Sequence, residues 1–436
     1  MDNKTENITW KRIFTDYNLF YFFMMIMYAA KGNSWMQYLS TYLGNPIAMA
    51  FPIVLTILFI IKNKIHFRNK NFWSLMSIFV IWIIVVSIKF GFHPHAFYII
   101  FQLLIAYCIV FVYKLKMFYQ YEQIITFLTI IGIFVWGTNL IFPSFWNIIC
   151  PYFAFDRGDS ITRYNFFFAS VLNTHSNNPF RNPGFSWEPG MNACLICFAI
   201  FLNLVRTQCK LKKNYNFFVL TIGLISSFST TGYSCFLGCI IPFFLLNRQL
   251  RHSFIYILFI IPIITYVYQQ DFMWNKIETL QTTDESLYIA TTMETERGTY
   301  TPQRFDALAF EIMNIQEEPL TGYGLTDKDS FVKTKLSEFI YLPDGLLKLY
   351  AKYGLFLGGL ITLLMLFTTI KLRDRWMCKN SWMFFLLYLI VSISYHFYET
   401  PIFIAFYFCY FWLEKGENIK SSQKGYKNPI NFYSKL

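Results

Sequence analysis

Charged side chains are scarce in this chain. Asp, Glu, Lys and Arg make up 14% of its 436 residues, whereas 55% of the residues are hydrophobic and 21% are aromatic. A composition of this kind leaves no room for a separate soluble domain beside a membrane-embedded one. We therefore interpret residues 1–436 as a single membrane domain.

Clusters of metal-ligating residues are also lacking. Cys194 and Cys197 form a CxxC pair, but they lie in an apolar run with no second pair and no histidines nearby. We interpret them as small, buried core residues rather than as a zinc or redox site. His93 and His95 flank Pro94 in a short turn and form no metal constellation with other residues. The sequence predicts neither a metal nor another cofactor.

Long apolar runs dominate the chain instead. Most are near the roughly 20 residues that a helix needs to cross about 30 Å of hydrocarbon, and several are shorter. The predicted spans are residues 17–30, 45–62, 72–89, 95–113, 123–142, 190–205, 215–228, 232–246, 252–268, 353–370, 382–397 and 400–413. The fold class that follows is an all-α, polytopic integral membrane protein with about twelve transmembrane helices.

The basic residues orient these spans. Alternate inter-span segments, together with the two terminal segments, hold 24 of the 37 Lys and Arg residues and only 7 of the 25 acidic residues. Basic residues favour cytoplasmic loops, so we predict that both the N and C termini are cytoplasmic. Segments 143–189 and 269–343 are then long external loops. The net charge of +12 reflects this topology and contact with the lipid bilayer, not a nucleic-acid partner.

The first external loop ends in RNPGFSWEPG, residues 181–190, which runs directly into the sixth span. Its Pro and Gly residues indicate a bent, non-helical backbone at membrane level, which is tolerated only where it lines a protein-enclosed or watery cavity. Arg181 and Glu188 are thereby held near the bilayer surface, where ionisable groups mark functional sites. The alternative is an Arg–Glu ion pair that braces the loop. Arg157 and Arg163, earlier in the loop, are secondary candidates.

The second external loop contains an amphipathic stretch. Thr301 is the expected N-cap, with Pro302 at the first helical position. An apolar face then repeats at helical spacing and ends at Pro319, Gly322 and Gly324; it comprises Phe305, Leu308, Ala309, Ile312 and Ile315. We expect this helix to lie along the outer membrane surface. Arg304, in its first turn, would attract an anion together with the helix N-terminus, or is simply solvated.

The charged residues of the two loops suit one reaction. On the outer face of a bacterial-type membrane, activated sugars are carried on lipid diphosphates. Arg181 and Arg304 would stabilise the departing diphosphate without a metal, because guanidinium groups grip phosphate oxygens bidentately. Glu188 or Asp344 would act as general base on an acceptor hydroxyl. For Asp344, at the mouth of the tenth span, a helix cap is the alternative.

Four stretches resemble the O-antigen polymerase and ligase superfamily, in particular its Wzy-type repeat-unit polymerases. They are RNPGFSWEPG, STTG at 229–232, Arg304 through PLTGYG at 319–324, and PDGLLKLYAKYGLFLGG at 343–359. Thr230 stands where many relatives carry arginine. Pro343 and Asp344 replace a His-Asn pair, whose histidine is the proposed base of the ligases.

The resemblance implies a multi-pass protein of the bacterial cytoplasmic (inner) membrane, with undecaprenyl-diphosphate-linked oligosaccharides as donor and acceptor. It would transfer the growing O-antigen or capsular glycan to the non-reducing end of a new repeat unit. A chain-length regulator and a flippase are the implied partners. The alternatives are a ligase-type transferase and, in another class, a lipid-linked oligosaccharide flippase or transporter. Transporters usually place their polar site near the bilayer midplane, often with repeat symmetry, whereas the charges here lie in the loops.

Overall fold

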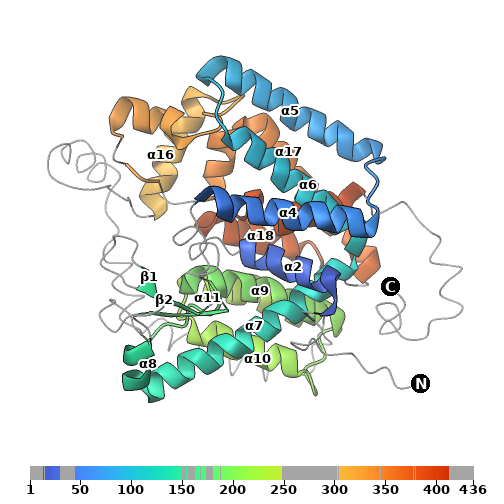
Figure 1. Ribbon diagram of the computed structural model, residues 1–436, viewed down its shortest axis with the longest axis vertical. Coiled ribbons are helices and arrows are strands. Elements are labelled where there is room, and N and C mark those ends of the chain that lie inside the picture. Colours follow the sequence, from blue (N-terminus) through green and yellow to red (C-terminus); the bar gives the residue numbers. More distant parts are fainter. Residues whose placement is uncertain are drawn as a thin grey trace, which may run out of the picture.

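Figure 1 shows the computed structural model of the chain, in which most helices run side by side in one bundle. The structure describes residues 13, 15–29, 45–149, 154–155, 163–166, 168–172, 180–186, 188–247, 302, 304–338, 340–342, 345–376, 378 and 380–411.

The helices of the first half follow the predicted apolar runs. They are α2 (Tyr17–Ala29), α4 (Asn45–Asn63), α5 (Lys70–Phe90), α6 (His95–Tyr113) and α7 (Lys116–Ile141), and the short α8 (Pro143–Ile149) follows. The α5 helix begins where the Asn69 side chain accepts hydrogen bonds from the N–H groups of residues 71 and 72. Such an N-cap satisfies donors that have no partner inside the helix.

The second half contains α9 (Pro189–Arg206) and α10 (Tyr215–Ser226). It continues with α11 (Thr230–Cys235), the π-helical η2 (Phe236–Ile240) and α12 (Ile241–Asn247), which run on without a break. Later come α16 (Arg304–Glu317), α17 (Leu346–Trp376), α18 (Met383–Ser394) and α19 (Pro401–Phe408), the last extended by η8 (Cys409–Phe411).

Six of the described helices are long and apolar enough to cross a membrane. They are Lys70–Phe90, His95–Tyr113, Lys116–Ile141, Pro189–Arg206, Thr230–Asn247 and Leu346–Arg373. Shorter apolar helices occupy five further predicted spans. The helical membrane class is thus confirmed, while the number of twelve spans and the sidedness of the termini stay predictions. The predicted span 252–268 lies outside the described residues.

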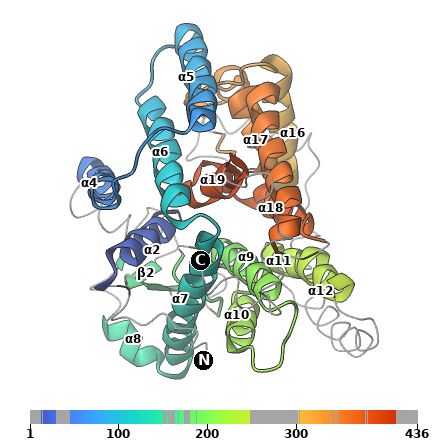
Figure 2. The ribbon, with the colours of Figure 1, turned by 90° about the vertical axis from the view of Figure 1, so that its right-hand side faces the viewer.

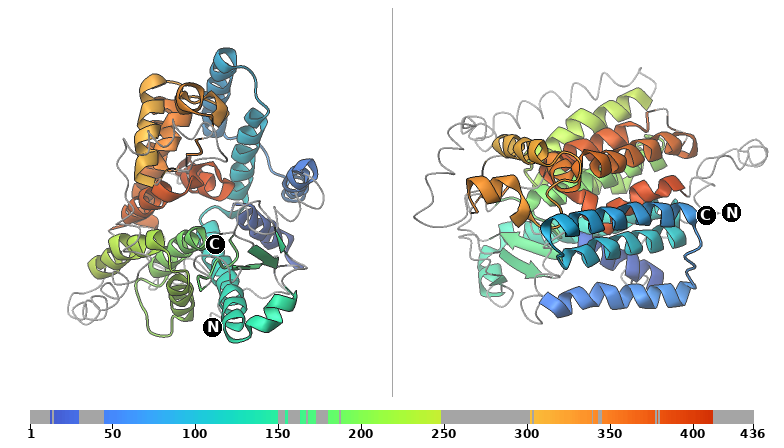
Figure 3. Two further views of the ribbon diagram at one scale, coloured as in Figure 1. Left: turned by 90° about the vertical axis from the view of Figure 1, so that its left-hand side faces the viewer. Right: turned by 90° about the horizontal axis from the view of Figure 1, so that it is seen from above.

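The bundle has two chemically different ends, visible on opposite sides of Figure 1 and again in the view from above in Figure 3. The first, here called the loop end, carries α8, α16 and a small sheet. The opposite one, here called the basic end, carries the α4–α5, α6–α7, α9–α10 and α17–α18 connections. Its basic residues include Lys62, Lys64, Arg68, Lys70, Lys114, Lys116, Arg206, Lys210, Lys212, Lys213, Lys371, Arg373 and Arg375. Both predicted long loops therefore contribute their described parts to the same end.

The sheet is a departure from the all-helical prediction. Its antiparallel strands are β1 (Ala154–Phe155), β2 (Arg163–Phe166) and β3 (Ala169–Leu172), with Ala154 opposite Tyr164 and Arg163 opposite Leu172. Ala169 and Val171 of β3 are buried against Val135 of α7. The sheet is thus a small attachment on the loop end and leaves the helical class unchanged.

Two helices form the centre of the bundle. All of Pro189–Val205 in α9 is buried, as is all of α19. Viewed from the basic end, α9 lies among α7, α10 and α11, and α19 lies between α6 and α17 (Figure 2). A helix that is apolar all round belongs in such a core. Cys194 and Cys197 are fully buried there, which confirms their interpretation as core residues.

The outer helices expose apolar stripes in place of a charged surface. On α5, Ile81, Ile84, Val85 and Ile88 are all exposed. Residues three and four positions apart lie on one face of a helix, so these side chains form a continuous apolar strip. Such a strip suits a lipid environment.

The amphipathic helix differs from its prediction. It begins at Arg304, two residues after Pro302, and the expected cap Thr301 lies outside the described residues. Its buried face includes Phe310, Glu311 and Asn314, whereas Ile312 of the expected apolar face is 46% exposed. The reason is tertiary, since α16 packs on a small core formed with Val332, Ile340 and Leu342. Of the expected apolar face, Ile312 is left exposed, and Leu308, Ala309 and Ile315 are partly buried.

Candidate functional site

The segment before α9 is fixed by one buried asparagine that sequence reasoning missed. The backbone N–H of Asn182 donates to the Ser226 carbonyl (2.9 Å), and its Nδ2 donates to Ser226 Oγ (2.9 Å). Its Oδ1 accepts from the Gly184 N–H at 2.8 Å. Asn182 thus ties the RNPG turn to the end of α10, and it does so directly beside Arg181.

The bent backbone expected from Pro183 and Gly184 is present. Gly184 has φ +56°, and a Cβ there would overlap the Asn192 side chain of α9. Gly132 of α7 approaches so closely that its Cβ would lie 2.9 Å from Gly184 Cα. At Gly184 the positive φ favours glycine, which adopts it at little cost. At both positions a larger residue would also lack room. The turn is therefore locked between α7 and α9.

Arg181 lies at the start of this turn and is half-buried. Its Nε donates to the carbonyl oxygen of Ser227 at 3.3 Å. Two residues further on, Ser229 caps α11 by accepting from the Gly232 N–H at 3.2 Å, and Thr230 is the first helical residue. The structure therefore places Arg181 next to the STTG stretch that contains Thr230.

Glu188 is the N-cap residue of α9, yet its side chain does not cap that helix. Its Oε1 accepts a hydrogen bond from the Tyr395 hydroxyl at 3.0 Å. A Cβ on Gly190 would overlap this hydroxyl oxygen, so glycine is required for the contact. The described partner of the Glu188 carboxylate is thus Tyr395 and not Arg181, contrary to the ion-pair alternative.

Residues at the end of α18 contact both α11 and the segment before α17. Ser394, next to Tyr395, shares a hydrogen bond of 2.8 Å with Thr231 of α11. Gly345, which directly follows Asp344, packs against Ile393, and a Cβ there would lie 3.1 Å from the Ile393 carbonyl oxygen. We call the assembly of Arg181, Glu188, Thr230 and Tyr395 the arginine–glutamate site.

The side chains of the remaining predicted site residues lie outside the described part of the structure. Arg304 is the first residue of α16 and Arg163 lies in β2, but only their backbone is described. Arg157 and Asp344 lie outside the described residues. Of the predicted set, Arg181, Glu188 and Thr230 are linked through neighbouring residues: Arg181 bonds Ser227, Thr231 bonds Ser394, and Tyr395 bonds Glu188.

A second polar cluster at the loop end was missed by sequence reasoning. Lys352 Nζ donates to Glu399 Oε1 at 2.6 Å, the Tyr353 hydroxyl donates to the same oxygen at 3.0 Å, and His95 Nε2 lies 3.3 Å from Lys352 Nζ. Lys352 and Glu399 are both buried. We call these four residues the lysine–glutamate site. The signal was a lysine in the first turns of an apolar span together with a lone acid between the last two spans.

A neighbouring ion pair extends this cluster along α17. Lys348, one helical turn before Lys352, donates to Asp327 Oδ2 at 2.9 Å, and Tyr323 donates to Asp327 Oδ1 at 3.0 Å. Burial raises the pKa of Asp327, but Lys348 outweighs it and the net pKa lies below the usual value. Burial and the Asp327 charge raise the pKa of Tyr323 well above its usual value. Asp327 is therefore ionised and Tyr323 neutral near pH 7.

The PLTGYG turn holds these residues in place. The N–H groups of Tyr323 and Gly324 donate to the Ala351 and Lys352 carbonyls at 2.9 and 3.1 Å. Trp82 of α5 donates to the Thr321 carbonyl at 2.9 Å, and Lys89 of α5 pairs with Glu318. The turn is thus wedged between α5 and α17, and it covers the buried lysines.

Comparison with known proteins leaves the site to be interpreted from its chemistry. No family model matches the chain, and a search of curated proteins finds no match. In the described part of the chain, no group of three or more His, Cys, Asp and Glu side chains is placed to hold a metal ion.

Proposed function

We propose that this protein is a glycosyltransferase that polymerises undecaprenyl-diphosphate-linked oligosaccharide repeat units. The observation that carries the proposal is the arginine–glutamate site: a half-buried arginine and a half-buried carboxylate, held by rigid contacts at the loop end of an apolar bundle. The apolar stripes of the outer helices allow a lipid carrier to lie alongside.

The proposed reaction is an inverting displacement. An acceptor hydroxyl attacks the anomeric carbon of the donor glycan, and the bond from that carbon to the diphosphate oxygen breaks. The electron pair leaves with undecaprenyl diphosphate, whose charge Arg181 and Arg304 stabilise. The acceptor proton passes to a carboxylate, Glu188 or Asp344. Arg163, Arg157 and Thr230 are secondary candidates for contacts with the sugar or the diphosphate.

The proposal also implies a membrane, an orientation and partners for the protein. It places the chain in a bacterial inner membrane, with the loop end outside and both termini in the cytoplasm. Donor and acceptor are both lipid-linked, so a flippase must deliver the units and a chain-length regulator is a fitting partner. The positive charge of the basic end supports this orientation.

A ligase-type transferase would use the same donor with another acceptor, and a flippase or transporter would move the unit unchanged. A transporter is expected to hold its polar site near the midplane of its spans. Among the described residues, the ion pairs of Lys352 and of Lys348 lie at the loop end, and that of Arg206 lies at the basic end. This distribution favours surface chemistry over transport.

The test is elongation in vitro. Undecaprenyl-diphosphate-linked repeat units, isolated from cells that lack this protein, are added to the purified protein in vesicles. The wild-type protein should produce a ladder of longer lipid-linked chains and release undecaprenyl diphosphate. Replacing the true base by its amide should slow turnover about 10²- to 10⁴-fold, so Glu188→Gln and Asp344→Asn are compared. Absence of elongation by folded wild-type protein contradicts the proposal, and full activity of both variants removes both carboxylates as the base.

A further inference from the structure

The α18–α19 connection, residues 394–400, is buried except at His396. Every other residue in that range is buried, whereas His396 is half-buried and reaches the surface at the loop end. It directly follows Tyr395, whose hydroxyl donates to Glu188. An ionisable side chain at the mouth of an apolar span marks a functional site by default. His396 is therefore a candidate for a further residue of the arginine–glutamate site.

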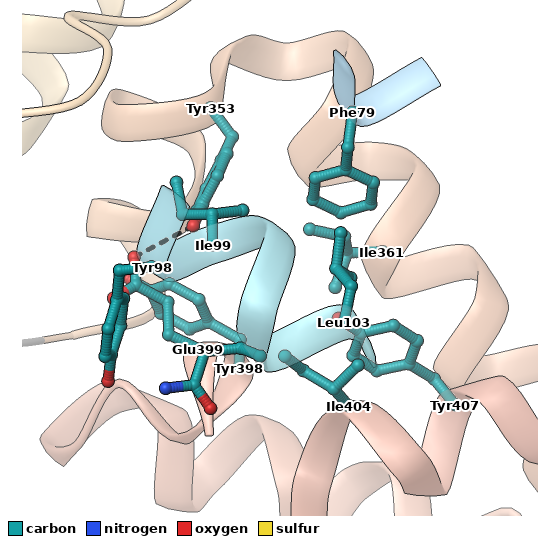
Figure 4. Close-up of a pocket in the computed structure, with 11 residues that line it drawn as sticks. Phe79, Tyr98, Ile99, Leu103, Tyr353, Ile361, Tyr398, Glu399, Ile404 and Tyr407 are labelled. Carbon is teal, nitrogen blue, oxygen red and sulfur yellow. Dashed lines mark hydrogen bonds between the residues drawn. The ribbon is translucent and has the colours of Figure 1, made fainter. Parts of the chain in front are cut away.

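The backbone at His396 is fixed by its neighbours. The Phe397 N–H donates to the Tyr395 carbonyl at 2.9 Å, and His396 has φ −81° and ψ 62°. These are the features of a three-residue turn centred on His396. Figure 4 shows Glu399, three residues further on, in the hydrogen bond that it accepts from Tyr353. The connection thus presents the histidine from a rigid support.

The backbone at Tyr395 determines which side His396 faces. Tyr395 is extended, with φ −145° and ψ 135°, and side chains alternate along an extended chain. Ser394 and His396 therefore lie on the side opposite to Tyr395. Ser394 shares a hydrogen bond of 2.8 Å with Thr231 of α11. His396 is thus on the side of the start of α11, while Tyr395 turns to Glu188.

The start of α11 is also where Arg181 lies. Its Nε donates to the Ser227 carbonyl at 3.3 Å, in the turn that leads to Ser229, the N-cap of α11. Arg181 and His396 thus approach this place from two different elements, and Glu188 lies on the other side of the connection. In an inverting displacement, the base and the leaving group act on opposite faces of the sugar ring. This arrangement suits that requirement.

We infer that His396 binds the leaving diphosphate beside Arg181, an inference that rests on the proposed function. When the bond from the anomeric carbon breaks, the electron pair stays on the diphosphate oxygen. An imidazole N–H donates a hydrogen bond to a phosphate oxygen and keeps its proton. Hydrogen bonds to an ionised acceptor are roughly twice as strong as neutral ones. Two consecutive residues then serve the two sides of one reaction: Tyr395 orients Glu188, and His396 holds the leaving group.

The test is binding of the lipid product to the purified protein in nanodiscs. The probes are undecaprenyl diphosphate and undecaprenol, which lacks the phosphates, and native mass spectrometry measures their affinities. We expect His396→Ala to weaken diphosphate binding about tenfold and to leave undecaprenol binding unchanged. His396→Gln keeps an N–H donor and should recover part of the affinity. His66→Ala, which removes an exposed histidine at the basic end, is the matched control.

Three results would overturn this inference: the wild-type protein binds both probes equally, His396→Ala binds the diphosphate as tightly as His66→Ala does, or His396→Ala loses both probes alike. If His396→Ala does not fold, His396→Phe, which keeps a ring without an N–H donor, takes its place. Binding requires no polymerisation. Diphosphate binding that depends on His396, without elongation by the wild-type protein, would leave the site standing and remove the proposed function. Elongation by His396→Ala with an unchanged KM for the donor would do the reverse.

Discussion

Glu122 and Glu188 are two carboxylates with opposite surroundings. Glu122, at the basic end, is 0% exposed and accepts two hydrogen bonds from Arg206, at 2.6 and 2.7 Å. It also accepts from Asn203 at 2.7 Å and from Asn216 at 3.1 Å. Glu188, at the loop end, is half-buried and has a single tyrosine hydroxyl as its described partner.

The difference indicates a structural role for Glu122 and a reactive role for Glu188. Donors from α9 and α10 lock both helices to α7 through Glu122, and both of its oxygens accept hydrogen bonds. Glu188 is held in direction by Tyr395 but keeps acceptor capacity for a substrate hydroxyl. The same chemical group therefore stabilises the bundle at one end and is available for chemistry at the other.

Removing each carboxylate in turn is the strongest test of whether Glu122 and Glu188 have different roles. Glu122→Ala leaves Arg206 without its partner, and loss of one member of a buried pair costs about 3–5 kcal/mol of stability. Glu188→Ala removes one hydrogen bond, worth about 1 kcal/mol. Chemical unfolding of the purified variants in detergent, followed by circular dichroism, measures both. Equal losses would show that the two glutamates are both structural.

A second variant tests whether Gly190 exists to admit Tyr395. Gly190→Ala places a methyl group on the tyrosine hydroxyl, and overpacking of this kind costs about 1–3 kcal/mol. In the double variant with Tyr395→Phe, the clash is relieved and most of that stability should return. The four unfolding free energies form a double-mutant cycle. Additive effects would mean that the contact with Glu188 is not what excludes a side chain at position 190.

The smallest expected effect concerns pH and Asp327. Its folded pKa is lowered, so its ion pair with Lys348 stabilises the fold above the ordinary carboxyl pKa of about 4. That contribution is lost as the pH falls through the lower folded value. Because the Asp327 side chain is 39% exposed, solvent screens the pair. The stability difference between the wild-type protein and Asp327→Asn should shrink from pH 6 to pH 3; a constant difference would contradict the assignment.

Elements defined by long apolar runs could be predicted from the sequence. The α5, α6 and α9 helices lie within a few residues of their predicted ranges, and α7 begins seven residues before its predicted range; their agreement follows because hydrophobic length is a local property. The bend before α9 was also predictable, since Pro183 and Gly184 restrict the backbone by themselves. For the same reason, Arg181 and Glu188 were found at the mouth of a span.

Partners that come from distant parts of the chain were not predictable. Tyr395 contacts a residue that lies 207 positions away in the sequence, and Glu399 contacts one that lies 47 positions away. The neighbouring sequence indicates neither contact. The sequence also did not indicate that α16 packs Phe310 and Asn314 against residues from 332 to 342. Sequence patterns identified which residues carry charge, but only the tertiary structure determines what surrounds each charge.

The most direct test of the account compares two arginines in the elongation assay. Arg181→Lys and Arg206→Lys each keep the charge and lose the planar fork. With turnover expressed per folded molecule, Arg181→Lys should lose most of its polymerisation at normal stability. Arg206→Lys should be less stable but should turn over as the wild-type protein does. Normal chain elongation by Arg181→Lys, or loss confined to Arg206→Lys, would contradict the assignment of catalysis to the loop end.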